Sequence, residues 1–231
     1  MLSFIYQGQF QLLPFLIASK KDVDKALTLI INHYAIKKEC PEFFHNRDVK
    51  AEGIQSSLKN QDFVILPSTR DHCSLILFRL SSFDPKDYDF EFAAKTYIMT
   101  FETAIFNNGP QNGMVGLIDM RGSRFGHLFR PSISSIRKGL RLLQEGCPIE
   151  VQRVHVLNTF PFVNAMMSKF FRNIIDLRSK IHLNTFSHDK TFHLSDISKQ
   201  NSLAHIRHGL RKVLRGTHPK VLLTFRLWRR P

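Results

Sequence analysis

The sequence predicts an α/β domain whose mostly parallel sheet is flanked by helices. The first observation is a short apolar run at residues 114–118, closed by Asp119 and Gly122, which is typical of a strand buried on both faces of a sheet. The second is that helical patterns stand on both sides of this run, and such an alternation favours a parallel sheet. Because ligand-facing residues gather where parallel strands end, the function is sought beside this strand.

A small helical lead is expected at residues 1–58. Asp22 can cap a helix in which apolar residues recur with the helical period over residues 23–34, and Pro41 follows its end. Residues 42–61 are polar and mixed, which indicates turns. The end of this stretch is the expected boundary between the lead and the main domain.

The main domain is expected at residues 59–199. Besides the central run, strands are predicted at residues 63–66, 74–80, 151–157 and 180–185. A long helix is predicted to open at Asp84 and Pro85, and a later helix to carry Pro131 in its first turn. The segment 162–175 is apolar on more than one side of a helix, so it is either plain core or the wall of a lipid-filled cavity.

Composition indicates a globular body with a basic end. The 231 residues carry a net charge of +14, and 43% are hydrophobic, including 21 Phe. Residues 197–231 contain nine Lys or Arg and no Asp or Glu. The tail at residues 200–231 can therefore meet nucleic acid or an anionic membrane surface, and composition does not choose between them.

Cysteine usage and hydropathy indicate the compartment in which the protein is expected. Three cysteines, far apart and without metal-site spacing, predict neither a disulfide framework nor a zinc site, which fits a reducing, cytosolic compartment. Residues 1–21 lack a basic leader and are broken by Pro14, so no signal peptide is expected. No run approaches the roughly 20 apolar residues of a spanning helix.

The search for catalytic motifs is negative. The sequence holds no nucleophile elbow, no phosphate-binding glycine loop and no helical zinc motif. Asp119 ends a strand where acids often act, but no partner histidine or nucleophile is evident, so structural hydrogen bonding is the favoured role. His127 and His155 are likewise interpreted as structural. We therefore predict no enzyme activity, no metal site and no cofactor.

The order of these segments resembles the CRAL-TRIO lipid-transfer family. The resemblance rests on residues 148–163, on SKFF at residues 168–171 and on RSKIH at residues 178–182, together with the central strand and Gly122. It is greatest for the branch of the alpha-tocopherol transfer protein and cellular retinaldehyde-binding protein, particularly its insect members. It extends over residues 11–199, so it includes the helical lead.

The resemblance implies a hydrophobic pocket between the sheet and a mobile lid, in which one tocopherol, retinoid or phospholipid molecule is carried between membranes. Burial alone can hold such a ligand, since each buried methylene contributes roughly 0.8 kcal/mol. From the facing of strands and helices, the predicted wall residues are Phe101, Ile105, Ile118, Phe129, Val156, Phe160, Phe162, Met166 and Phe170.

The resemblance also implies a phosphoinositide site. In this branch, basic residues just before the Ile-His strand contact a phosphatidylinositol bisphosphate, and Arg178 and Lys180 occupy the matching places, with Lys190 as a companion. Arg offers such a head group a bidentate fork and Lys a compact charge. The expectation is a cytoplasmic monomer that associates peripherally with phosphoinositide membranes.

The C-terminus departs from the family. After Lys199 the family has a Leu-Pro segment and a Tyr-Gly-Gly turn, whereas this chain has a divergent basic tail. Two alternatives therefore stay open. One is a truncated, inactive carrier whose pocket closes poorly, and the other is a nucleic-acid-binding protein that acts through the tail, although no recognised binding module accompanies it.

Overall fold

The computed structural model describes residues 12–69, 71–109, 111–159 and 182–187, the last range for its backbone alone. Residues 12–18 are helical. The elements that follow are α2 (Val23–Glu39), α3 (Pro41–Phe44), α4 (Glu52–Asn60), β1 (Gln61–Leu66), β2 (Cys73–Leu80), η1 (Pro85–Asp87), α5 (Phe90–Asn108), β3 (Gly113–Asp119), α6 (Phe125–Phe129), α7 (Ile133–Arg141), η2 (Leu142–Gly146), β4 (Val151–Thr159) and β5 (His182–Ser187).

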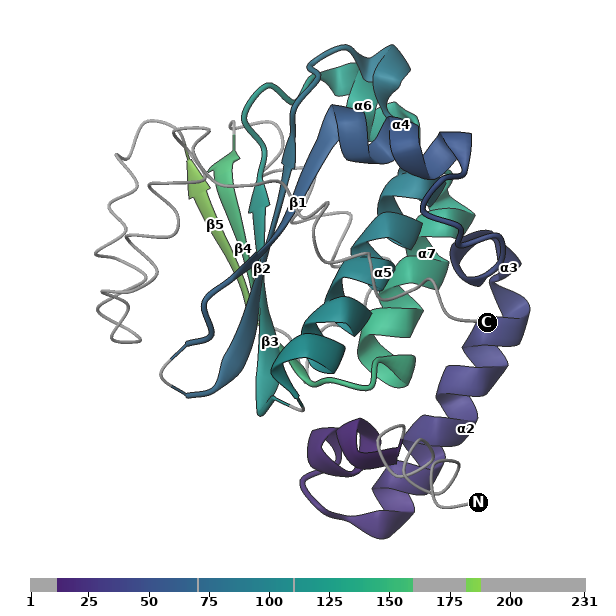
Figure 1. Ribbon diagram of the computed structural model, residues 1–231. Coiled ribbons are helices and arrows are strands. Elements are labelled where there is room, and N and C mark those ends of the chain that lie inside the picture. The colour runs from purple at the N-terminus through teal and green to yellow at the C-terminus, as the bar shows by residue number, and fades with distance from the viewer. Residues whose placement is uncertain (1–11, 70, 110, 160–181, 188–231) are drawn as a thin grey trace.

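The five strands form one sheet in the order β1-β2-β3-β4-β5. β1 pairs with β2 in antiparallel orientation, and the remaining neighbours pair in parallel. The predicted α/β class with a mostly parallel sheet is therefore confirmed, and β3 is its middle strand. Helices α3, α4, α5 and α7 lie on the right of the sheet in Figure 1, and the arrows of β3, β4 and β5 point toward the end of the molecule at which α6 lies.

The helical lead begins as its sequence predicts. The Asp22 carboxylate accepts a hydrogen bond from the Lys25 backbone N–H at 3.1 Å and caps α2, and Pro41 opens α3 directly after Cys40. The lead packs on the main domain, because the buried His33 donates from Nδ1 to the Gly146 carbonyl at 2.7 Å.

Two predicted helix starts are wrong by a few residues. Pro85 opens only the short turn η1, and α5 begins after Asp89, whose carboxylate accepts from two backbone N–H groups. Pro131 precedes Ser132, the residue that caps α7. In both cases the side chain that satisfies free N–H groups, rather than the proline, determines where the helix starts.

Residues 42–61 hold more helix than their polar composition predicts. α4 occupies residues 52–60 and runs into β1 without a linker. Its single fully buried aliphatic side chain, Ile54, packs with Met99 of α5, and both are 0% exposed. Leu58, one turn beyond Ile54, packs against the same pair, so α4 carries a short apolar stripe within a mostly polar sequence.

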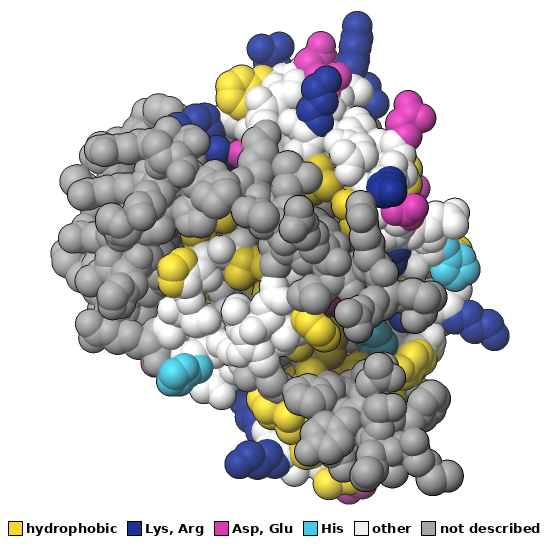
Figure 2. Space-filling model, in the orientation of Figure 1, with side chains coloured by type: hydrophobic (Ala, Val, Ile, Leu, Met, Phe, Trp, Pro, Cys, Tyr) yellow, Lys and Arg dark blue, Asp and Glu magenta, His cyan; other side chains and the backbone are white. Residues whose placement is uncertain are grey.

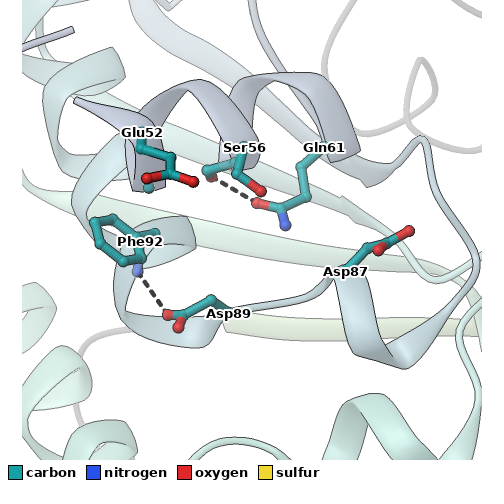
Figure 3. Close-up of a pocket in the computed structure, with 8 residues that line it drawn as sticks. Glu52, Ser56, Gln61, Asp87, Asp89 and Phe92 are labelled. Atoms are coloured by element: carbon teal, nitrogen blue, oxygen red, sulfur yellow. Dashed lines mark hydrogen bonds between the residues drawn. The ribbon is translucent and has the colours of Figure 1, made fainter. Parts of the chain in front are cut away.

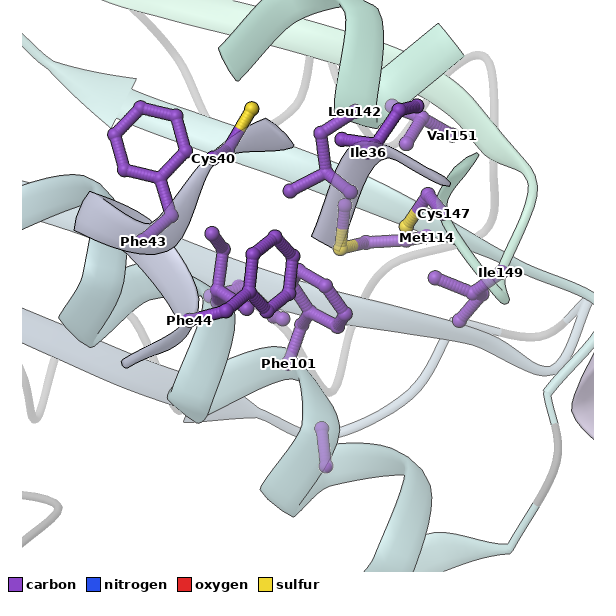
Figure 4. Close-up of a cluster of buried hydrophobic side chains, with 13 residues drawn as sticks. Ile36, Cys40, Phe43, Phe44, Phe101, Met114, Leu142, Cys147, Ile149 and Val151 are labelled. Carbon is purple, nitrogen blue, oxygen red and sulfur yellow. The ribbon is translucent and has the colours of Figure 1, made fainter. Parts of the chain in front are cut away.

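The main core lies between the lead, α5, η2 and the sheet (Figure 4). Its members come from every one of these elements, and they are Ile36, Cys40, Phe43, Phe44, Ile76, Ile98, Phe101, Ala104, Met114, Leu142, Cys147, Ile149 and Val151. This cluster ties the lead to the carboxyl half of α5, so the lead is a packed part of the fold.

Alternation along the strands assigns each residue to a face of the sheet. A Cβ added to Gly116 would lie 3.4 Å from the Tyr97 hydroxyl of α5 and 3.6 Å from Val154, so these residues share the face that α5 packs against. Ile118, two residues beyond Gly116, lies on this same face. Leu117 lies on the opposite face and is 0% exposed.

Candidate functional site

The predicted pocket residues that the structure describes separate into a core pair and a strand-end group. Phe101 belongs to the main core at 2% exposure, and Ile105 packs against that core from the carboxyl half of α5. Ile118 and Val156 are paired in register across β3 and β4. Neither Ile118 nor Val156 belongs to the main core that contains Phe101.

The remaining predicted residues divide between α6 and the part of the chain outside the described ranges. Phe129 lies on α6 and is 76% exposed. Those outside are the pocket residues Phe160, Phe162, Met166 and Phe170 and the basic residues Arg178, Lys180 and Lys190. Their assignments stay predictions.

An apolar surface lies on the helix-facing side of the sheet near the strand ends. Phe78, Ile118 and Val154 come from three neighbouring strands and are each half-buried. Val156 borders them and is 0% exposed. Val154 also packs against the main core, so the apolar area available to a ligand on this face is mainly that of Phe78 and Ile118. We call Phe78, Ile118 and Val154 the strand-end surface.

Phe78 and Val154 are the residues of this surface that sequence reasoning missed. The register Phe78↔Ile118 and Gly116↔Val154 places them with the predicted Ile118. The signal that could have found them is parity, because residues at even spacing on paired parallel strands share a face. The parity of β4 is interrupted by a register shift beside Met114, which the sequence does not reveal.

Helix α7 adds a second stretch of incompletely buried apolar side chains. Ile133 is 55% exposed, and Ile136, Leu140 and Leu143, which continue its stripe into η2, are half-buried. α7 is fixed to α5 because the Ser135 hydroxyl donates to Glu91 Oε1 at 3.1 Å. Its apolar stripe is thus held in place without being fully covered.

Asp119 has a structural role in the described part of the chain. Its carboxylate is 3% exposed and accepts hydrogen bonds from Asn158 Nδ2 at 2.6 Å and from the Arg121 backbone N–H at 3.0 Å. These bonds join the end of β3 to the end of β4 and close the turn after β3. The prediction that Asp119 serves in hydrogen bonding agrees with this geometry.

Burial favours the neutral forms of two histidines and three cysteines. Burial, with a smaller contribution from the nearby Arg153 charge, lowers the pKa of His155 to about 4. Burial also lowers the pKa of His127. Burial raises the pKa of the Cys147 thiol to about 12, and it raises the pKa of Cys40 and Cys73 as well. Thiols held neutral are poor nucleophiles.

A separate polar pocket of about 370 Å³ lies between α4, η1 and the start of α5 (Figure 3). Its lining includes three carboxylates, those of Glu52, Asp87 and Asp89. Asp89 caps α5, and Asp87 accepts a hydrogen bond from Ser82 at 2.6 Å. Two of the three acids therefore serve local structure, and the lining does not suit an apolar ligand.

Among the described residues, no cluster of three His, Cys, Asp or Glu side chains could hold a metal ion. In the same part of the chain, every helix is too short or too polar to cross a membrane.

Known proteins resemble this chain over most of its length. A family model described as the CRAL/TRIO domain matches residues 58–201. Proteins named alpha-tocopherol transfer protein-like from Homo sapiens and Pongo abelii are each 31% identical over 179 residues, and the one from Mus musculus is 30% identical. Each match covers 74% of this chain and 51% of the relative, so the chain spans about half the length of the curated relatives it matches.

A solved structure also aligns with this chain. The crystal structure of Sfh5 aligns with a TM-score of 0.49 and 10% identity, over 77% of this chain and 64% of that one.

Proposed function

This chain belongs to the CRAL/TRIO domain family, and we propose that it binds one hydrophobic, lipid-like molecule and transfers it between membranes. The relatives carry the name of a tocopherol transfer protein, which supports a ligand of the tocopherol, retinoid or phospholipid class. We further propose that the chain acts by binding and not by catalysis, as a cytoplasmic monomer.

The observation that carries this proposal is the strand-end surface. Ile118 is half-buried, whereas its neighbour Leu117, on the opposite face of the same strand, is 0% exposed. A ligand placed over Ile118 would remove this apolar area from water, and each Å² removed stabilises the complex by about 25 cal/mol. Long isoprenoid or acyl chains match such a surface because they offer apolar area and few groups that require hydrogen bonds.

The proposed ligand position revises the role of two predicted wall residues. Phe101 and Ile105 become core residues that support α5. Ile118 keeps its place at the ligand, and Val156, which is 0% exposed, packs beside it. Phe160, Phe162, Met166 and Phe170 remain proposed wall residues from the resemblance alone.

The test is transfer of a fluorescent tocopherol analogue from donor to acceptor vesicles by the full chain. Ile118→Glu should weaken analogue binding by at least about tenfold, because a carboxylate would have to be buried against the ligand or protonated. The matched control is Leu27→Glu on α2, where the wild-type side chain is already 56% exposed. Equal binding by both variants would contradict a ligand at this position.

We also propose, from the family resemblance, that Arg178, Lys180 and Lys190 bind a phosphatidylinositol bisphosphate head group. The double variant Arg178→Ala, Lys180→Ala should lose binding to phosphoinositide vesicles and keep binding to phosphatidylserine vesicles of equal charge. Equal loss on both kinds of vesicle would mean that these residues act only as general surface charge.

A further inference from the structure

The turn after β3 and helix α6 combine exposed aromatic side chains with exposed arginines. Phe129 is 76% exposed and Phe125 is 51% exposed, and their spacing of four residues puts them on one face of α6. Arg121, Arg124 and Arg130 are exposed beside them. We call these five residues the arginine–phenylalanine surface.

All charged residues in the segment around α6 are basic. Residues 120–144 contain six Arg or Lys and no Asp or Glu. Lys138 and Arg141 are paired with Glu42 and Glu39 of the lead. Arg121, Arg124 and Arg130, together with Arg137, form no ion pair with a described residue, so their charge is available to an external anion.

Neighbouring acids do not cancel this charge. The turn η1 packs beneath α6, since a Cβ at Gly126 would lie 2.7 Å from Pro85. It brings Asp84, Asp87 and Lys86, with a net charge of −1, beside the three arginines of the surface, so the local balance of charge is positive. Figure 2 shows Lys and Arg side chains at the top of the molecule, the end at which α6 lies, with hydrophobic and some acidic side chains beside them.

The exposed side chains stand on a fixed support. The buried His127 accepts a hydrogen bond at Nδ1 from the Arg124 backbone N–H at 3.0 Å, and its ring packs edge-on against Tyr88 with centroids 5.7 Å apart. Phe83 packs against Gly122, where a Cβ would come within 2.1 Å of the ring. A five-residue helix held from beneath in this way presents Phe125 and Phe129 outward at low additional cost in conformational entropy.

We infer that the arginine–phenylalanine surface docks the protein on the surface of an anionic bilayer. This inference rests on the proposed lipid-carrier function. Guanidinium groups attract anionic head groups, while exposed Phe side chains insert at the boundary between head groups and acyl chains. Duplex nucleic acid would use the arginines, but its bases are already stacked on one another and offer the exposed Phe side chains no partner. α6 lies at the end of the molecule to which the strands point (Figure 1), so docking there brings the strand-end surface toward the membrane.

The experiment is co-sedimentation of the full chain with phosphatidylcholine vesicles that contain 0 or about 30% phosphatidylserine. One variant is Phe125→Ser, Phe129→Ser, and the other is Arg124→Glu, Arg130→Glu. Each should weaken partitioning onto the phosphatidylserine vesicles by at least about tenfold, because each removes two groups of the docking surface. Circular dichroism confirms that each variant is folded.

Matched controls change the same chemistry elsewhere. Phe106→Ser removes a Phe that is 72% exposed at the end of α5, and Lys38→Glu, Lys50→Glu reverses two exposed charges on the lead. These controls should change partitioning by less than about twofold. Controls that fall as far as the α6 variants would overturn the inference in favour of general basic charge. Binding to duplex DNA is measured as well. The inference would also be overturned if the phenylalanine variant bound vesicles like the wild type while the arginine variant lost binding to vesicles and to DNA equally.

Binding of the fluorescent tocopherol analogue without vesicles separates this inference from the proposed function. The arginine variant, which changes no predicted wall residue, should retain the analogue like the wild type and lose only vesicle binding. Retention of the analogue together with unchanged vesicle binding would overturn the docking surface and leave the carrier function standing. Failure of the wild-type chain to bind the analogue would contradict the carrier function itself.

Discussion

Asn158 donates a hydrogen bond from Nδ2 to the buried carboxylate of Asp119 at 2.6 Å, and this bond joins the ends of the two strands that carry Ile118 and Val156. Asn158 adopts a positive φ of 54°, so its backbone is held in a conformation that few residues other than Asn and Gly accept readily. The Asp119 carboxylate at the end of β3 therefore holds together the two strands that carry the proposed ligand site.

Asp119→Ala should lower the free energy of unfolding by about 1–3 kcal/mol, because it leaves the Asn158 amide and the Arg121 N–H without their acceptor. Urea unfolding followed by circular dichroism measures this loss. Asp24→Ala on the exposed first turn of α2 is the control and should cost only a few tenths of a kcal/mol. A similar loss in both variants would show that Asp119 makes no special contribution.

Glu102→Ala should lower the free energy of unfolding by about 3 kcal/mol, because it removes the carboxylate that pairs with a buried guanidinium. Arg47, whose side chain is 8% exposed, donates from Nη2 to Glu102 Oε2 at 2.5 Å and thereby links the segment after α3 to α5. The exposed pair of Arg141 and Glu145 offers the comparison, and Glu145→Ala should cost less than about 1 kcal/mol. A loss for Glu102→Ala no larger than that of Glu145→Ala would refute the buried pair.

Gly122→Ala should destabilise the protein more than Gly109→Ala. Both glycines have positive φ, 76° and 72°, so both substitutions carry a backbone cost of about 1–3 kcal/mol. Only at Gly122 would the new Cβ meet a neighbour, the Phe83 ring, while Gly109 has open space around it. Thermal unfolding of the two variants, and of Gly122→Ala with Phe83→Ala, measures the difference. Equal losses in the single variants would contradict the close approach.

Stability should fall as the pH drops from about 6.5 toward about 4. In the folded protein the pKa of His155 is lowered to about 4. As the pH falls below about 6.5, the ordinary pKa of histidine, the unfolded chain therefore binds a proton before the folded chain does. The stabilisation from the neutral ring is fully present above pH 6.5 and is lost through this window, on the order of 3 kcal/mol. His155→Asn should flatten the pH dependence of urea unfolding, and an unchanged slope would exclude His155 as its source.

The sheet could be predicted from sequence because its strands are short apolar runs bounded by turn residues. The runs at residues 63–66, 74–80 and 114–118 each lie inside an observed strand. α4 could not be predicted, since it is held by Ile54 and by contacts with α5 that become visible only in the folded chain. Tertiary packing here outweighs local composition.

The candidate site was harder to predict than the fold. β3 is apolar on both faces, so the sequence cannot say which face meets helices and which residues stay half-buried. Ile118 is among the residues predicted from sequence, whereas Phe78 and Val154 depend on strand register. The arginine–phenylalanine surface is present in the sequence as aromatic and basic residues, but their exposure depends on how His127 and Pro85 hold α6.

The most direct test of the central claim is mass spectrometry of an organic extract of the purified full chain, with Ile118→Glu purified in parallel. The carrier function predicts one hydrophobic molecule in near-stoichiometric amount from the wild-type chain and a strongly reduced amount from the folded variant. An extract of the folded wild-type chain with no enriched hydrophobic molecule, together with salt-dependent retention of the protein on DNA, would contradict it.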